Sequence, residues 1–162
     1  MEDHIIDLKE DLLPDNIQRI MYTKFLKLDE SSVLPEFKTS GSAGADVCSL
    51  EHKKFLPNGR CVVKTGLACE IPEGYVLMVC SRSGLAKQGL IVGNQPGIID
   101  SDYRGEIGVL LWNTSDSTIE IKPGDRIAQL LLIPAPCWIV NPVEDLSCTE
   151  RGQGGFGSTG IS

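Results

Sequence analysis

The sequence predicts an all-β domain, built as a sandwich or a barrel of many short strands. Turn-forming Pro, Gly, Asn and Ser residues recur along the chain, for example at residues 57–59, 72–74 and 123–124. Short runs of β-forming residues lie between these turns, a spacing that is typical of sandwiches and barrels. The chain has 162 residues, of which 41% are hydrophobic, so it fits one globular domain with a core of its own.

Five runs of β-forming residues are predicted to be strands: 60–67, 75–80, 106–112, 118–122 and 126–133. Run 75–80 is apolar on both faces, so we expect it in the centre of a sheet. In run 118–122, Ile119 and Ile121 alternate with Glu120 and Lys122, which predicts one buried face and one face in water.

The two ends of the chain do not follow this pattern. Residues 1–20 place apolar side chains around Pro14, and we expect an N-terminal arm that is either helical or flexible. Residues 21–150 are predicted to form the β domain. Residues 151–162 are rich in glycine, which loses the most backbone entropy on ordering, so this tail cannot hold a fixed conformation alone.

Composition excludes several classes of function. A net charge of -7 argues against a binder of nucleic acid or of anionic membranes, and no run of about 18 apolar residues predicts a membrane span. The first residues lack the features of a signal peptide, so we expect a cytoplasmic or nuclear protein, in a host cell if viral, and no secretion. The six cysteines form no C-x-x-C pair and are expected to be free thiols.

Two segments place polar residues beside small ones. In residues 42–47, Asp46 is either a carboxylate that holds a metal ion or its water shell, or an acid that caps a turn. In residues 81–86, Arg82 and Ser83 follow the most apolar strand. They either bind phosphate oxygens, or form a local ion pair and a helix cap.

Two further segments carry candidate groups. Residues 93–106 are predicted to form a β-hairpin, in which an acid could act as a general base toward water; the alternative is a hairpin with polar decoration. In residues 124–130, Gln129 is expected to share a strand face with Ile127 and Leu131. A glutamine on a core face needs a partner, which is either backbone or a ligand phosphate.

The glycine-rich tail is the fifth segment. A disordered terminus is the simple interpretation. The functional interpretation is a lid that becomes ordered when Arg151, Ser158 and Thr159 bind phosphate and Phe156 meets a ring. The tail also matches G-x-G-x-x-G, but no strand precedes it and no helix can follow, so it is not a dinucleotide-binding motif.

Taken in order, these segments resemble the five motifs of the trimeric dUTPase family (deoxyuridine triphosphate nucleotidohydrolases). The resemblance covers residues 22–160 and rests on Ser-Ala-Gly-Ala-Asp, Arg-Ser-Gly-Leu-Ala, Gly-Ile-Ile-Asp-Ser-Asp-Tyr-Arg-Gly, Gly-Asp-Arg-Ile-Ala-Gln and Arg-Gly-Gln-Gly-Gly-Phe-Gly-Ser-Thr-Gly. Two features depart from the family: Ser81 replaces a common proline, and the arm at 1–20 is longer than the minimum. The resemblance implies a jelly-roll-like distorted β-barrel and a homotrimer, in which the tail closes over a neighbouring subunit's site.

The same resemblance implies a Mg²⁺-assisted dUTP diphosphatase. Water would attack the α-phosphate, with Asp100 as the general base, and dUMP and pyrophosphate would be released. Asp46 would contact the Mg²⁺ ion through a water molecule. The implied substrate-binding residues are Arg82, Ser83, Gly84 and Gln129 for phosphate; Asn94, Gly97, Ile98, Ile99 and Gly108 for uracil; Tyr103 for deoxyribose; Phe156 for base stacking; and Arg151, Gly157, Ser158 and Thr159 for the outer phosphates.

Two other functions remain open at this point. One is a dCTP deaminase of the same superfamily, which the intact 97–105 segment and complete tail make less favoured. The other is a nucleotide-gated binding protein that uses the scaffold to regulate a partner. The expected partners are dUTP and further copies of the chain, with no nucleic acid and no membrane.

Overall fold

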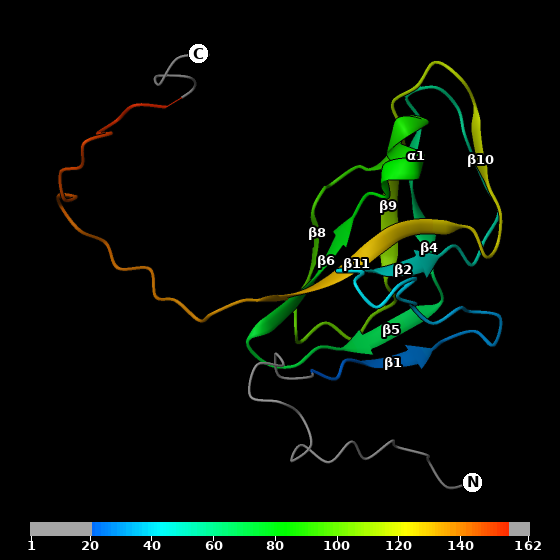
Figure 1. The fold of residues 1–162 in the computed structure, drawn as a ribbon, viewed down its shortest axis with the longest axis horizontal. Coiled ribbons are helices and arrows are strands. Elements are labelled where there is room, and N and C mark those ends of the chain that lie inside the picture. Colours follow the sequence, from blue (N-terminus) through cyan, green and yellow to red (C-terminus); the bar gives the residue numbers. More distant parts are fainter. Residues whose placement is uncertain (1–20, 156–162) are drawn as a thin grey trace, which may run out of the picture.

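The computed structural model describes residues 21–155, and almost all of their regular structure is β (Figure 1). The strands are β1 (Lys24–Lys27), β2 (Ala45–Cys48), β3 (Lys53–Phe55), β4 (Arg60–Lys64), β5 (Leu67–Glu70), β6 (Tyr75–Cys80), β7 (Leu90–Val92), β8 (Gly97–Ile99), β9 (Gly108–Asn113), β10 (Ile119–Ile121) and β11 (Arg126–Pro134). One short helix, α1 (Ser83–Lys87), follows β6. The predicted all-β fold class is confirmed.

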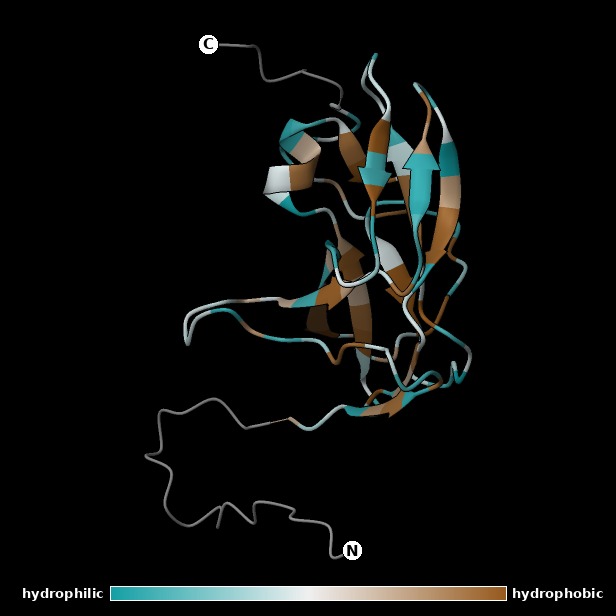
Figure 2. Cartoon of the chain, turned by 90° about the vertical axis from the view of Figure 1, so that its right-hand side faces the viewer, coloured by the Kyte–Doolittle hydropathy of each residue, from teal (hydrophilic) through white to brown (hydrophobic). Residues whose placement is uncertain are grey.

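The strands form four antiparallel sheets that enclose one core. The largest sheet has the order β2-β11-β6-β8, and the second has the order β4-β9-β7. Two-stranded sheets, β1-β5 and β10-β3, complete the domain. Buried apolar side chains from all of these sheets form a single cluster, which includes Val47, Val79, Leu111 and Ile127. In Figure 2 the strands near the middle of the domain are mostly hydrophobic, and several outer strands and turns are hydrophilic.

Strand β6 lies where the sequence predicts it, with the same bounds, between β11 and β8. Its two faces differ more than expected, because Leu77 and Val79 are buried on one face. Val76, Met78 and Cys80, on the other face, are only partly covered. Strand β10 also follows the prediction: Ile121 is buried, Ile119 is half-buried and Glu120 is exposed.

The predicted strand 60–67 is wrong, because it is two strands that meet at Gly66. This residue has a φ of 67°, in the left-handed region that favours glycine, so the chain turns between β4 and β5. A Cβ at Gly66 would lie 2.1 Å from Ser32 Oγ, and that hydroxyl donates a hydrogen bond to the Gly66 carbonyl. The turn is therefore tight, and the Ser32 side chain packs over it.

The predicted hairpin at 93–106 is confirmed only at its base. The strands on either side of the segment, β7 and β9, pair antiparallel in one sheet, and the Gly93 N–H donates to the Leu110 carbonyl. Between them, β8 leaves this sheet and pairs with β6. The segment is instead a bridge between the two larger sheets. This placement matters for the site, because it brings residues 97–108 to an edge of the β6 sheet.

Beyond Pro134 the chain leaves the barrel as an extended arm (Figure 1). Its first hydrogen bond, from the Ala135 N–H to the Gly74 carbonyl, still ties it to the domain. The arm exposes large apolar side chains, at Trp138, Ile139, Val140, Val143 and Leu146. The expected boundary between the domain and the lid, at 150/151, stays a prediction, and the N-terminal arm at 1–20 lies outside the described residues.

The described residues contain no helix long and apolar enough to cross a membrane. All six cysteines are free. Burial raises the pKa of the Cys48 and Cys69 thiols, which makes them poor nucleophiles and suits their place in the core.

Candidate functional site

Asp46 is the centre of a buried ion-pair cluster at one end of the β2-β11-β6 sheet. Its side chain is only 8% exposed, and a buried carboxylate is stable only when it is paired. Arg82 Nε donates to Oδ1 at 2.9 Å, and Arg126 Nη1 donates to Oδ2 at 2.9 Å. The arginines arrive from different elements, Arg82 from the end of β6 and Arg126 from the start of β11.

Asp46 also lines a cleft of about 200 Å³, together with Lys38, Ser42, Ala43, Gly44, Gln129 and Leu131. The first and fourth predicted segments therefore meet. Gly44 allows this, because a Cβ there would lie 3.1 Å from Leu131 Cδ1 and 3.3 Å from Gln129 Cβ. A larger side chain at position 44 would therefore collide with β11.

Gln129 faces this cleft because β11 contains a β-bulge. The register with β2 shifts between Arg126 and Ala128, and as a result both Ile127 and Ala128 are buried in the core. Gln129 and Leu131 then face away from the core and toward the cleft. The predicted face shared by Gln129 and Ile127 is wrong, whereas the face shared with Leu131 is confirmed.

Ser83 and Gly84 lie at the start of α1, directly after Arg82. Of the alternative interpretation of this segment, the ion pair of Arg82 is present but the serine cap is not, since Arg82 occupies the N-cap position and no side chain caps the helix. Ser81 instead fixes the neighbouring strand, because its hydroxyl accepts a hydrogen bond from the Val92 N–H at 2.8 Å. This contact gives a role to the serine that replaces the family's common proline.

A second cleft, of about 220 Å³, contains the candidate base. It is lined by Ile98, Ile99, Asp100, Tyr103, Glu106, Ile107 and Gly108. Asp100 follows the last residue of β8 and is exposed, and the Tyr103 N–H donates to its carbonyl at 3.1 Å. The Tyr103 hydroxyl donates to the Glu106 carbonyl at 3.0 Å, so the ring is held over Gly105.

Buried hydrogen bonds attach the floor of this cleft to the β4–β5 turn. Thr65 Oγ1 donates to the Ile107 carbonyl at 2.7 Å, and the Ile107 N–H donates to the Leu67 carbonyl at 2.7 Å. Glu106 Oε1 accepts from the Gly66 N–H at 2.8 Å. The segment after Tyr103 is thus fixed at several points, which a site that selects by shape requires.

The proposed uracil-binding groups lie along β8. Gly97 is paired with Val79 of β6, and a Cβ on it would meet Val79 Cβ at 3.3 Å and Asn94 Nδ2 at 3.4 Å. The Asn94 amide therefore lies beside Gly97. Strand β8 is the edge of its sheet, so one side of its backbone is not used by a neighbouring strand.

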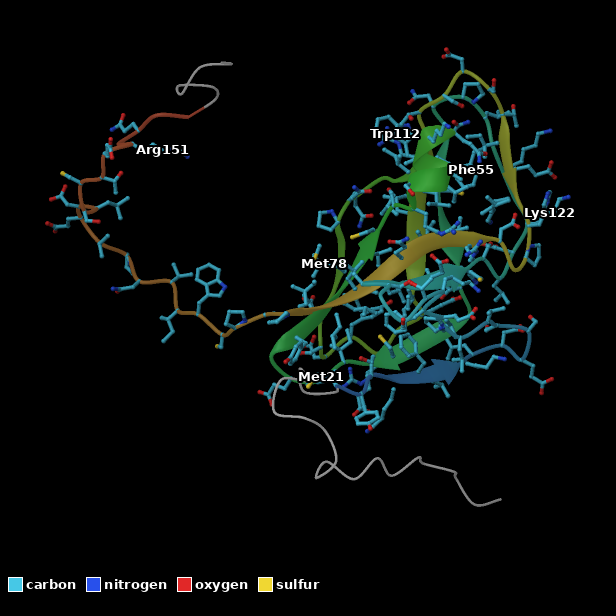
Figure 3. The ribbon with its side chains drawn as sticks, viewed as in Figure 1. Met21, Phe55, Met78, Trp112, Lys122 and Arg151 are labelled. Carbon is cyan, nitrogen blue, oxygen red and sulfur yellow. The ribbon has the colours of Figure 1, made fainter. Side chains whose placement is uncertain are left out.

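The structure does not bring all of the predicted site residues together within one chain. The Asp46 cleft and the Asp100 cleft share no lining residue. Arg151 lies at the far end of the extended arm, away from the barrel (Figure 3). Phe156, Gly157, Ser158 and Thr159 lie outside the described residues.

The described part of the chain supplies few ligands for a metal ion. Between residues 21 and 155 there is no group of three His, Cys, Asp or Glu side chains that could hold one. Asp46 is the carboxylate in its cleft, and it is already paired with two guanidinium groups. This donor set fits an ion that is held mainly by phosphates and water, as Mg²⁺ commonly is, and it does not fit direct coordination by several side chains.

Sequence reasoning missed three charged residues that the structure places at the clefts. Lys38 lines the Asp46 cleft, Arg126 pairs with Asp46, and Glu106 lines the Asp100 cleft. Arg126 and Glu106 both fall within segments that the sequence singled out. Their contacts join residues 80 and 40 positions apart in sequence, so no local pattern indicated them.

Comparison with known proteins gives a consistent result. The dUTPase family matches residues 30–160. The deoxyuridine 5'-triphosphate nucleotidohydrolase of Treponema denticola is 50% identical over 141 residues, which covers 85% of this chain and 98% of that protein. The enzyme of the same name from Chlamydia pneumoniae is 51% identical over 144 residues, which covers 86% of this chain and 99% of that protein.

Solved structures agree with this. A mutant dUTPase of Staphylococcus bacteriophage 80alpha, with dUpNHpp, has a TM-score of 0.81 and 30% identity, and covers 86% of this chain and 99% of its own. A mutant dUTPase from phage phi11 of S. aureus, described with a structural Mg(II) ion, has a TM-score of 0.73 and 27% identity. The match covers 79% of this chain and 100% of that one. The match extends over most of the barrel and both clefts, and on this basis the chain belongs to the dUTPase family.

Proposed function

We propose that the chain hydrolyses dUTP to dUMP and pyrophosphate, with Asp100 as the general base and Mg²⁺ as the cofactor. The observation that carries the proposal is the cleft in which the Asp100 carboxylate and the Tyr103 ring lie beside an edge strand. An acid, an aromatic ring and free backbone groups in one cleft are suited to a nucleoside next to a reactive phosphate. The family membership supports the same reaction.

The Asp100 cleft would bind the nucleoside. The edge of β8 offers N–H and C=O groups that can pair with uracil, and the Asn94 amide lies at its start. Tyr103 would pack against the deoxyribose and exclude a 2′-hydroxyl. Because Tyr103 is held by its bond to the Glu106 carbonyl, the cleft cannot readily widen to accept a ribose.

The Asp46 cleft would bind the phosphates. Arg82 presents a planar fork of donors, which suits phosphate oxygens, and Ser83 and Gly84 follow it at the start of α1. Gln129 lines the cleft from β11. Asp100 would orient the attacking water and accept its proton, a role worth about 10²–10⁴-fold in rate. Mg²⁺ on the phosphates would neutralise their charge, and Asp46 would hold it through a water molecule.

A complete site would need several copies of the chain, and we propose a homotrimer. Support comes from the separation of the two clefts and from the extended arm, whose apolar side chains stay exposed in one chain. Large exposed apolar patches usually mark an interface. The arm would carry Arg151 and the tail, with Phe156, Gly157, Ser158 and Thr159, to a neighbour's site as a lid.

The test is pyrophosphate release from dUTP, dTTP, dCTP and UTP, with and without Mg²⁺, alongside native mass. We expect dUTP to be preferred by more than about 10²-fold, loss of activity with a chelator, and the mass of three chains. Comparable turnover of dCTP and dUTP would refute the assigned specificity. Formation of dUTP from dCTP would favour a deaminase instead.

A further inference from the structure

We propose that Arg126 is a positioning residue, which holds the Arg82 guanidinium so that it presents free N–H groups to the triphosphate. The inference rests on the proposed function and adds a residue to it. Neither the sequence motifs nor the resemblance gave Arg126 a role. It acts through Asp46 and through its own backbone.

The first support is the way in which two arginines divide one carboxylate. Asp46 Oδ1 accepts from Arg82 Nε at 2.9 Å, and Oδ2 accepts from Arg126 Nη1 at 2.9 Å. Arg82 Nη2 lies 3.5 Å from Oδ2, which is longer than the 2.7–2.9 Å of a good charge-assisted bond. Arg126 therefore makes the shorter hydrogen bond to Oδ2, and the ion pair between Arg82 and Asp46 is not fully bidentate.

The second support is a contact to the Arg126 backbone. Arg82 Nη1 donates to the Arg126 carbonyl at 3.0 Å. With Nε fixed on Asp46 as well, two points define the plane of the Arg82 guanidinium. A guanidinium has five N–H donors, so the second Nη1 hydrogen and the Nη2 group remain for a phosphate.

Burial explains why Arg126 matters. The Asp46 side chain is 8% exposed, and Arg82 and Arg126 are 21% and 42% exposed. If Arg126 were removed, Oδ2 would be left without its close partner inside the domain, which is costly. Arg82 Nη2 already lies 3.5 Å from the same oxygen. Closing that gap would turn Nη2 toward Asp46 and away from the ligand.

This reasoning predicts a selective defect. Binding of phosphate should weaken, whereas binding of the nucleoside in the Asp100 cleft should not change, because the two clefts share no residue. A general loss of structure would weaken both. The contrast between a triphosphate and a nucleoside ligand therefore separates positioning from folding.

The experiment compares Arg126→Gln, Arg126→Lys and the control Lys122→Gln in the full-length protein. Lys122 is exposed, four residues before Arg126, and its substitution removes the same charge. Dissociation constants are measured by calorimetry for dUpNHpp and for deoxyuridine, at low and high salt. For Arg126→Gln we expect the dUpNHpp constant to rise about tenfold, the effect of losing one charge-assisted bond, with deoxyuridine unchanged.

Arg126→Lys keeps a donor for Oδ2 and should stay within about threefold of wild type, because an ammonium can fill that single contact. Lys122→Gln should leave both constants unchanged. The tenfold loss should persist at high salt, since Asp46 is buried and its ion pair with Arg126 is screened less than a pair of fully exposed charges. If Arg126→Gln does not assemble, as judged by native mass, Arg126→Met takes its place and keeps the apolar stem of the side chain.

Unchanged dUpNHpp affinity in the Arg126→Gln or Arg126→Met protein would overturn the inference. So would an equal loss for deoxyuridine, or a loss that disappears at high salt. If wild type binds dUpNHpp and these variants bind it equally well, only the role of Arg126 fails. If wild type binds neither ligand, the proposed function fails with it.

Discussion

Replacing Gly105 with alanine tests whether the position of Tyr103 controls the site. A Cβ at Gly105 would lie 2.3 Å from the Tyr103 hydroxyl oxygen, 2.5 Å from Cζ and 2.9 Å from Cε2. Ordinary contact begins at 3.4 Å, so the hydroxyl must retreat by at least 1.1 Å (3.4 minus 2.3). That shift would break its 3.0 Å bond to the Glu106 carbonyl.

The cost to folding should be small, because the lost hydrogen bond is exposed and worth about 0.5–1.5 kcal/mol. The cost to catalysis should be larger, since a displacement of about 1 Å near a reacting group can reduce the rate about 10²-fold. We expect kcat/KM for dUTP to fall by about 10–10²-fold. Discrimination against UTP should narrow, because the ring would no longer close the space for a 2′-hydroxyl.

The assay is steady-state pyrophosphate release from dUTP and UTP. Gly41→Ala is the matched control, because a Cβ at Gly41 meets nothing within 4 Å. It should behave as wild type. If Gly105→Ala retains wild-type kcat/KM and wild-type preference for dUTP over UTP, the placement of Tyr103 over Gly105 does not govern the site.

Four further predictions follow from the structure. Asp100→Asn should retain dUpNHpp binding but lose about 10²–10⁴-fold in turnover, and near-normal turnover would remove Asp100 as the base. Truncation after Glu150 should leave a folded assembly with little activity; unfolding or aggregation would make the tail structural rather than a lid. Asn113→Ala should lower the free energy of unfolding by about 3 kcal/mol or more, since this fully buried amide donates to the carbonyls of Phe55, Leu56 and Ser117 and accepts from Ser115. An unchanged denaturation midpoint would contradict that role. Glu51→Gln should alter the acid dependence of stability. The Lys64 N–H that donates to Glu51 lowers the pKa of this carboxyl below 4.5 in the folded chain, so its contribution exists above the unfolded pKa and fades as pH falls. Urea midpoints of wild type and variant should differ at pH 7 and converge as the pH falls through the lowered pKa of folded Glu51, and a constant gap would refute this.

Local patterns predicted the parts of the fold that depend on neighbours in sequence. Strand β6 has the predicted bounds, and the alternation at Ile119 and Ile121 correctly placed one face of β10 inside. These predictions succeed because, along a single strand, side chains alternate between the two faces of the sheet, so the sequence pattern directly gives the buried face. The five polar segments also contain most of the residues that line the two clefts.

The failures arise where contacts between distant residues override local signals. The bulge between Arg126 and Ala128 depends on pairing with β2, and it moved Gln129 from the expected core face to a cleft. Strands β7 and β9 pair as the predicted hairpin requires, but residues 97–99 between them pair with β6. No local pattern indicated this pairing, because β6 is distant in sequence. The Asp46 cluster joins three segments, so its second arginine had no signal in any one of them.

In the proposed trimer, the extended arm beyond Pro134 would place the consequences of a substitution in another molecule. If the arm delivers its tail to a neighbour, a change at Trp138 or Arg151 leaves its own chain's clefts intact and impairs the next subunit's turnover. Assemblies that mix wild-type chains with chains carrying a substituted arm would then contain both active and inactive sites. Their ratio would depend on the order of the two kinds of subunit in the assembly. Dilution would act in the same direction, because dissociation would remove the neighbour's tail from each subunit's site.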